Sequence, residues 1–172
     1  KGAEHFKKAL EINPENYFAK NSLYELGIES RFQSITPGGG QDETPEDYKS
    51  KAGYSFNYPG NWKVVETEKK VSLISPSQIT IEIFLLPRPA NLDFEQYVDR
   101  LRKPDLPLIK YGFIDLPNTQ KAYARLWKSE DGATISEFYV YKDGKIFGIL
   151  VNPATTEAEK AFDVIAGSLN AN

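Results

Sequence analysis

The sequence contains no cysteine and a single histidine, His5. Without thiols the chain has no disulfide, no thiolate metal ligand and no cysteine nucleophile, and its cysteine usage does not identify a redox compartment. One histidine excludes a metal site built from several histidines and argues against a histidine-based catalytic triad. We interpret His5 as a surface or inter-helix contact, and we expect no metal and no other cofactor.

Excess positive charge and long apolar runs are also missing. The net charge is −3, whereas a nucleic-acid-binding surface must be basic to meet the phosphates. No apolar run approaches the roughly 20 residues that a transmembrane helix needs. With 40% hydrophobic and 26% charged residues, the composition is that of a soluble folded protein. Because the chain begins at Lys1 within a helical pattern, we expect it to be a piece of a longer protein, and its localisation stays undetermined.

Residues 1–33 have the apolar spacing of two short helices joined by a turn at Pro14. In "GAEHFKKALEINPEN" the positions of Phe6, the Ala-Leu pair and Pro14 resemble the second helix of a tetratricopeptide repeat, and "YFAKNSLYELG" resembles the first helix of the next repeat. The pattern departs at Tyr24, where such repeats usually have glycine. The resemblance implies a helical hairpin at the end of a repeat array, whose upstream repeats would bind a protein partner.

Residues 34–52, "SITPGGGQDETPEDYKSKA", separate this hairpin from the rest. Three consecutive glycines and a polar, acidic composition predict a flexible linker. From residue 53 onward the apolar period changes to two, which is typical of strands. Eight segments follow this pattern: 54–59, 62–67, 70–76, 78–87, 109–117, 120–129, 134–144 and 145–153.

Residues 53–172 are predicted to form an α+β domain around an antiparallel sheet. Asp143-Gly144 and Asp131-Gly132 are strong hairpin signals between neighbouring strands. Apolar residues on both faces of the strands, such as Ile81 and Phe84, indicate that both faces are covered. Amphipathic stretches at 91–103 and 155–169 predict two helices for this purpose. The expected fold class is therefore an α/β/α sandwich, with helices on both faces of the sheet.

Three stretches of this domain carry a second resemblance: "YSFNYPGNW", "YKDGKIFGILV" and "AEKAFDVIAGSL". They are similar to the PsbP/Mog-like superfamily, which includes an extrinsic subunit of photosystem II and a Ran-binding nuclear transport factor. The resemblance implies the fold of residues 53–172 and a binding or assembly module rather than an enzyme. No motif in this chain carries over the photosystem role or the Ran-binding role.

Two proline-rich loops are candidate partner-binding surfaces, because stiff loops with apolar and basic side chains lose little entropy on docking. The alternative is that these side chains only cover a sheet edge. The candidate partner-binding residues are Arg88, Arg102, Lys103, Leu106, Leu108, Tyr111 and Phe113.

Three aromatic residues are candidates for a ligand platform. Tyr58 and Trp62 flank the turn at Pro59-Gly60, and Trp127 lies on a later strand. We favour packing as their role, and the alternative is an exposed platform for a sugar or another small ligand. The carboxylates show no spacing that indicates paired acid–base chemistry. The sequence therefore predicts a non-enzymatic protein-interaction or assembly module, with a small-ligand or carbohydrate-binding module, with or without weak catalysis, as the alternative.

Overall fold

The computed structural model describes residues 44–88, 91–101, 107–116, 119 and 121–171. These residues belong to one compact unit, Glu43–Asn172, which is described here by itself. The predicted tetratricopeptide-like hairpin of residues 1–33 and the three glycines of the predicted linker lie outside the described residues. So do Arg102, Lys103 and Leu106.

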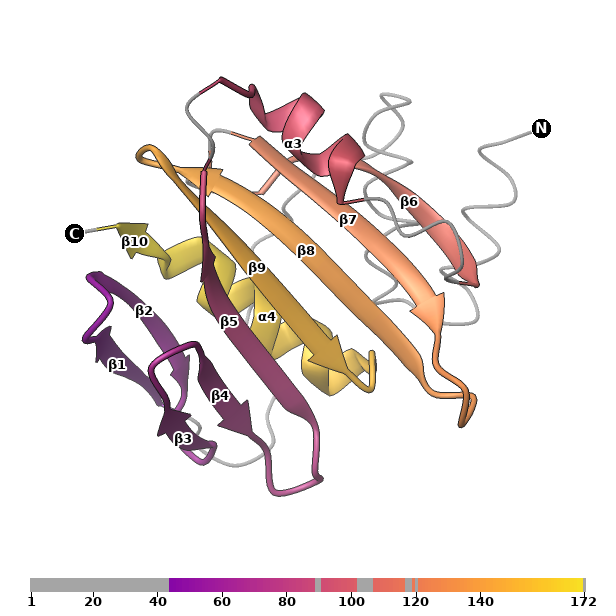
Figure 1. The fold of residues 1–172 in the computed structure, drawn as a ribbon. Coiled ribbons are helices and arrows are strands. Elements are labelled where there is room, and N and C mark those ends of the chain that lie inside the picture. The colour runs from indigo at the N-terminus through magenta and orange to yellow at the C-terminus, as the bar shows by residue number, and fades with distance from the viewer. Residues whose placement is uncertain (1–43, 89–90, 102–106, 117–118, 120, 172) are drawn as a thin grey trace, which may run out of the picture. The chain divides into compact units, whose positions relative to one another are not determined.

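The described part of the unit consists mainly of strands in two sheets (Figure 1). The seven-stranded sheet has the order β3-β4-β5-β9-β8-β7-β6, and the three-stranded sheet has the order β1-β2-β10. The strands are β1 Pro45–Ser50, β2 Tyr54–Pro59, β3 Lys63–Glu66, β4 Val71–Ile74, β5 Thr80–Leu86, β6 Leu108–Ile114, β7 Lys121–Lys128, β8 Thr134–Lys142, β9 Lys145–Asn152 and β10 Asn170–Ala171. The two helices are α3 Phe94–Arg100 and α4 Thr156–Ser168.

All eight predicted strands are present, and neighbouring strands are antiparallel. The two predicted hairpins are confirmed. Asp143 and Gly144 have φ values of 48° and 78° and join β8 to β9, as a two-residue turn with two positive φ angles requires. Gly132, at φ 85°, lies in the turn between β7 and β8.

Strand β1 lies in the stretch predicted as a flexible linker, so that prediction is wrong for residues 45–50. The strand pairs along its whole length with β2, from Pro45 opposite Pro59 to Ser50 opposite Tyr54. The Tyr48 ring lies 5.4 Å from the Phe56 ring, so one aromatic side chain anchors an otherwise polar strand. Because this strand is rich in acidic and other polar residues, it lacks the apolar alternation from which the other strands were predicted.

One face of the seven-stranded sheet is covered by helix α4 together with the three-stranded sheet. Helix α4 packs against β2, β5 and β9, and Figure 1 shows it behind β5 and β9. The Phe162 ring stacks on Phe138 of β8 at 3.8 Å, and Tyr54 of β2 meets Phe147 of β9 at 5.3 Å. The main core therefore lies between the two sheets and α4.

Among the described residues, the opposite face is covered only by α3, a helix of seven residues. A capping box between Asp93 and Gln96 starts the helix. Its apolar side packs against β7, β8 and β9 in a small cluster made by Phe94, Tyr97, Val98, Tyr123, Tyr139 and Ile146.

The predicted α/β/α sandwich is wrong, because helices do not cover both faces of the sheet. Beyond α3, Phe84 of β5 and Leu150 of β9 are half-buried on the face where the described part of the chain forms no second layer. On the other face, the aromatic side chains of strand β2 pack over much of the sheet surface that we had expected helices to cover. The described residues form a predominantly β fold with two short helices.

Candidate functional site

The strongest candidate site is the edge of the larger sheet formed by β6. In the described part of the chain this strand pairs with β7 alone. Ile109, Tyr111 and Phe113 are 52%, 51% and 49% exposed. Tyr111 and Phe113 were predicted as partner-binding residues, and the third predicted residue on β6, Leu108, is half-buried. Ile109 was not among the predicted residues, although the alternation of the predicted strand 109–117 places it with Tyr111 and Phe113; in the structure it lies at an irregularity in the pairing between Leu108 and Lys110.

A groove of about 430 Å³ runs between this edge and helix α3. Its apolar floor includes Phe113, whose ring lies 5.2 Å from Tyr123 and 6.4 Å from Phe94. The groove is lined by Glu95, Gln96, Val98, Asp99, Tyr111, Gly112, Phe113 and Tyr123. An apolar floor with a polar rim is the usual composition of a protein-binding surface. We call the three exposed side chains Ile109, Tyr111 and Phe113 together with this groove the β6 face.

Two charged contacts hold α3 beside the β6 face. Lys121 of β7 forms an ion pair with Glu95 at the start of the helix, and this hydrogen bond lowers the pKa of the Glu95 carboxyl. At the other end, Arg125 Nη1 donates to the carbonyl oxygen of Leu101 at 2.9 Å. The groove wall is therefore tied to the sheet at both ends.

Arg125 is the centre of a buried polar cluster under α3. It is 2% exposed, and its Nη2 donates to Glu137 Oε2 at 2.7 Å and to the Tyr139 hydroxyl. The Tyr139 hydroxyl donates in turn to Glu137 Oε1 at 2.5 Å. Burial, reinforced by this carboxylate, raises the pKa of Tyr139. A buried arginine needs such partners, because an unpaired buried charge is strongly destabilising.

Of the other predicted partner-binding residues, Arg88 lies away from β6. It is exposed, and its Nη1 donates to the Tyr141 hydroxyl at 2.8 Å while its guanidinium lies 4.8 Å from the centre of the Tyr141 ring. The described residues therefore bring together Leu108, Tyr111 and Phe113 on one strand, but they do not bring Arg88 to it.

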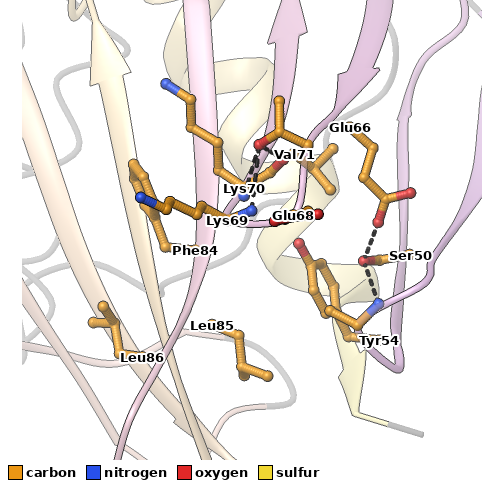
Figure 2. A pocket seen from close by; sticks show the side chains of 12 residues that line it. Ser50, Tyr54, Glu66, Glu68, Lys69, Lys70, Val71, Phe84, Leu85 and Leu86 are labelled. Atoms are coloured by element: carbon orange, nitrogen blue, oxygen red, sulfur yellow. Dashed lines mark hydrogen bonds between the residues drawn. The ribbon is translucent and has the colours of Figure 1, made fainter.

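A second hollow, of about 470 Å³, opens between the β1–β2 hairpin, the β3–β4 turn and strand β5 (Figure 2). Its apolar lining includes Tyr54, Phe84 and Leu86. Its most connected polar group is the Glu66 carboxylate, and Figure 2 shows this carboxylate bonded to Ser50. Tyr48 donates to the same carboxylate at 2.9 Å.

Two charged groups that line this second hollow, Glu66 and Lys70, are bonded to neighbouring side chains. The hydrogen bond from Ser50 is the main cause of the lowered pKa of Glu66. Burial and the bond to Glu66 raise the pKa of Tyr48 to about 12. Lys70 is paired with Glu82. At neutral pH the hollow thus presents the ionised Glu66 carboxylate, which is already bonded within the fold to Ser50 and to the protonated phenol of Tyr48.

Two of the three residues of the candidate aromatic platform are buried: Tyr58 is 8% exposed and Trp62 is 4% exposed. The Tyr58 hydroxyl donates to Glu46 Oε2 at 2.7 Å. Trp127 on β7 is half-buried, and its buried Nε1 has no hydrogen-bond partner among the described residues. A stacking platform needs ring faces open to solvent, which the first two rings do not have.

The turn between Tyr58 and Trp62 is closed by a hydrogen bond from the Trp62 amide to the Pro59 carbonyl oxygen, at 2.9 Å. Gly60 is needed there because a Cβ at this position would come within 2.8 Å of the Thr44 carbonyl oxygen. The glycine therefore allows β1 and the turn to approach each other.

Within the described ranges, no three acidic, histidine or cysteine side chains are grouped as metal ligands would be. No described helix is long and apolar enough to cross a membrane.

Comparison with known proteins identifies the fold. No family model and no curated protein matches the chain. Among solved structures, cyanobacterial PsbP (CyanoP) from Synechocystis sp. PCC 6803 matches with a TM-score of 0.57 and 17% sequence identity, covering 80% of this chain and 98% of that protein. A protein from Bacteroides thetaiotaomicron VPI-5482 matches with a TM-score of 0.53 and 16% identity, covering 73% of this chain. This chain spans 48% of the Bacteroides protein's length.

The likeness to CyanoP confirms the PsbP-like fold predicted for the C-terminal part of the chain. At 17% identity it shows the fold alone, because one fold supports many functions.

Proposed function

We propose that the unit described here is a non-catalytic protein-binding module that engages its partner through the β6 face. The observation that carries the proposal is the row of three large apolar side chains, each about half exposed, along an edge strand. Residues 1–33, which lie outside the described residues, are proposed as the end of a tetratricopeptide-like array whose upstream repeats recruit a protein partner.

An edge strand with apolar side chains has two ways of lowering its free energy by binding. Its outward-facing backbone N–H and C=O groups can pair with a further strand, and its exposed side chains can leave water. Natural edges are usually protected by charges or by bulges, and β6 has one of each in Lys110 and the irregularity beside it. Three apolar side chains remain exposed in spite of this protection, which favours an edge that is covered by a partner.

The groove beside the edge supplies room for the side chains of a bound segment. Because α3 is fixed to the sheet through Glu95 and Arg125, little conformational entropy is lost in forming this wall. A bound strand would place alternate side chains over Tyr111 and Phe113, which form one side of the groove.

Site-specific photo-crosslinking in cells tests this proposal. A photoreactive phenylalanine analogue replaces Tyr111 in the full chain, and the matched control replaces Val65 on β3, the strand at the other edge of the larger sheet, which is 38% exposed. We expect discrete protein adducts from position 111 that disappear when Phe113→Ser is added. Absence of adducts at 111, or the same adducts from both positions, would contradict the proposal.

A further inference from the structure

From the geometry of β6 we infer that the strand docking on this edge is β6 of a second copy of the chain, paired antiparallel about a two-fold axis at Gly112. This inference rests on the proposed function, because it names the partner of the β6 face. A two-fold contact is self-complementary and closes after two copies.

The regular part of β6 fixes where the axis lies. Tyr111 and Phe113 pair with Arg125 and Tyr123 of β7 and share one face of the sheet, whereas Gly112 lies on the other face. A two-fold axis perpendicular to a continuous sheet pairs residues whose side chains lie on the same face. The axis therefore lies midway between the two copies of one residue, which come directly opposite each other. After the irregularity beside Leu108, the regular pairing runs from Lys110 to Ile114, and its centre is Gly112.

This register brings compatible side chains together across the axis. Tyr111 of each copy comes opposite Phe113 of the other, and directly opposed aromatic pairs stabilise antiparallel strands. Lys110 comes opposite Ile114, so neither lysine faces the other. The central pair is glycine opposite glycine, and a Cβ added at Gly112 would have no atom of its own chain within 4 Å, so a larger side chain can be placed there without a clash in the chain.

The charges of the strand favour the same antiparallel arrangement. Lys110 lies near the start of the regular stretch, and Asp115 follows its end. In the two-fold arrangement the lysine end of each strand runs beside the aspartate end of the other, so Asp115 of one copy lies one position from Lys110 of the other. Parallel pairing in register would instead place lysine beside lysine and aspartate beside aspartate.

Pairing of β6 with the opposite edge, β3, fits less well. Strand β3 has four residues, Lys63–Glu66, against the seven of β6, and it would leave part of β6 uncovered. Such a head-to-tail contact would also repeat without closing and would build filaments.

Cysteine crosslinking tests the axis directly, because the natural sequence has no cysteine. In the full chain, Gly112→Cys should form a disulfide-linked dimer under mild oxidation. Residues opposite each other in antiparallel strands have Cα atoms about 4.5–5.5 Å apart, which suits a disulfide. In the matched control, Lys110→Cys, the two cysteines would be displaced by four residues, about 13 Å along the strands, which is too far.

We expect Gly112→Cys to crosslink about tenfold or more faster than Lys110→Cys, because the paired strands hold its thiols at a high effective concentration. Equal rates for the two variants would overturn the inference. Sedimentation velocity of the cysteine-free chain provides a second readout: dimer should grow with protein concentration and be lost in Tyr111→Ser/Phe113→Ser, but not in Val65→Ser. A chain that stays monomeric at every concentration overturns the inference, whereas photo-adducts to a different protein at position 111 would leave the proposed function standing.

Discussion

Strands β2 and β6 have similar sequences and opposite surroundings. "YSFNYP" of β2 and "LIKYGFI" of β6 each alternate large apolar or aromatic residues with smaller or polar ones. In β2 the aromatic residues Tyr54, Phe56 and Tyr58 are buried, whereas in β6 Tyr111 and Phe113 are half exposed. Strand β2 lies between β1 and β10 and packs against α4, and β6 forms an edge of the larger sheet.

The difference shows that alternation predicts a strand with two distinct faces but does not say what covers either face. For β2 the cover comes from distant parts of the chain, chiefly helix α4, whose residue Ser168 accepts a hydrogen bond from the Asn57 amide at 2.7 Å. For β6 the described residues supply only the short helix α3 beside it. Aromatic residues in the first setting contribute stability, and in the second they are available for binding.

The largest expected effect is a loss of stability, and it distinguishes the buried aromatic residues of β2 from the exposed ones of β6. Phe56→Ala removes a side chain that is 1% exposed and should lower the free energy of unfolding by about 3–5 kcal/mol, because it leaves a cavity in the core. The matched variant Phe113→Ala should lower it by only about 1 kcal/mol, because half of that ring is already in water. Urea denaturation of both variants measures the difference, and equal losses would remove the distinction between the strands.

A second comparison sets a buried ion pair against an exposed one. Glu137→Ala takes the carboxylate from buried Arg125 and should cost about 2–3 kcal/mol, because a buried charge loses its partner. Glu95→Ala breaks the ion pair with Lys121, in which both side chains are nearly half exposed, and should cost at most about 1 kcal/mol. If thermal and chemical denaturation gave the two variants the same stability, the Arg125 cluster would not support α3 as described.

The smallest effect concerns Tyr48, which joins β1 to β3. Its pKa is raised to about 12 in the fold, whereas an unfolded tyrosine titrates near 10. The unfolded chain therefore loses this proton first, and the stability that Tyr48 contributes is complete below pH 10 and is lost as the pH rises toward 12.

Tyr48→Phe should cost about 1 kcal/mol at neutral pH, for the lost hydrogen bond to Glu66. It should also reduce the fall in stability at alkaline pH. The control Ser50→Ala removes another hydrogen bond to the same carboxylate and should not reduce the alkaline fall, because the Tyr48 phenol stays in place. Denaturation curves across the alkaline range check both expectations, and an unchanged slope in Tyr48→Phe would contradict the role given to this phenol.

Much of the larger sheet was predictable because its signals are local. The turn at Asp143-Gly144 and the apolar alternation of β5 and β9 depend on neighbouring residues only. Helix α4 was predicted for the same reason, and its N-cap is Thr155. Strand β1 was missed because its stability depends on pairing with β2 and on one contact of Tyr48 with distant Glu66.

The candidate site was predictable only in part. Tyr111 and Phe113 were selected from a proline-rich stretch that overlaps the predicted strand 109–117, and the structure places them on β6, but that this strand forms an edge was not predicted. The groove beside them could not be predicted, because it depends on how α3 lies across β7, and that position is set by Lys121 and Arg125, more than twenty residues away in the sequence.

Hydrogen exchange at several protein concentrations tests the central claim, that β6 is an edge covered by a second copy. The backbone amides of residues 110–114 should exchange rapidly in dilute protein and become protected as the concentration rises, while protection of residues 54–59 in β2 stays high and constant. Amides of β6 that are as protected as those of β2 in the most dilute sample, or that gain no protection at any concentration, would contradict it.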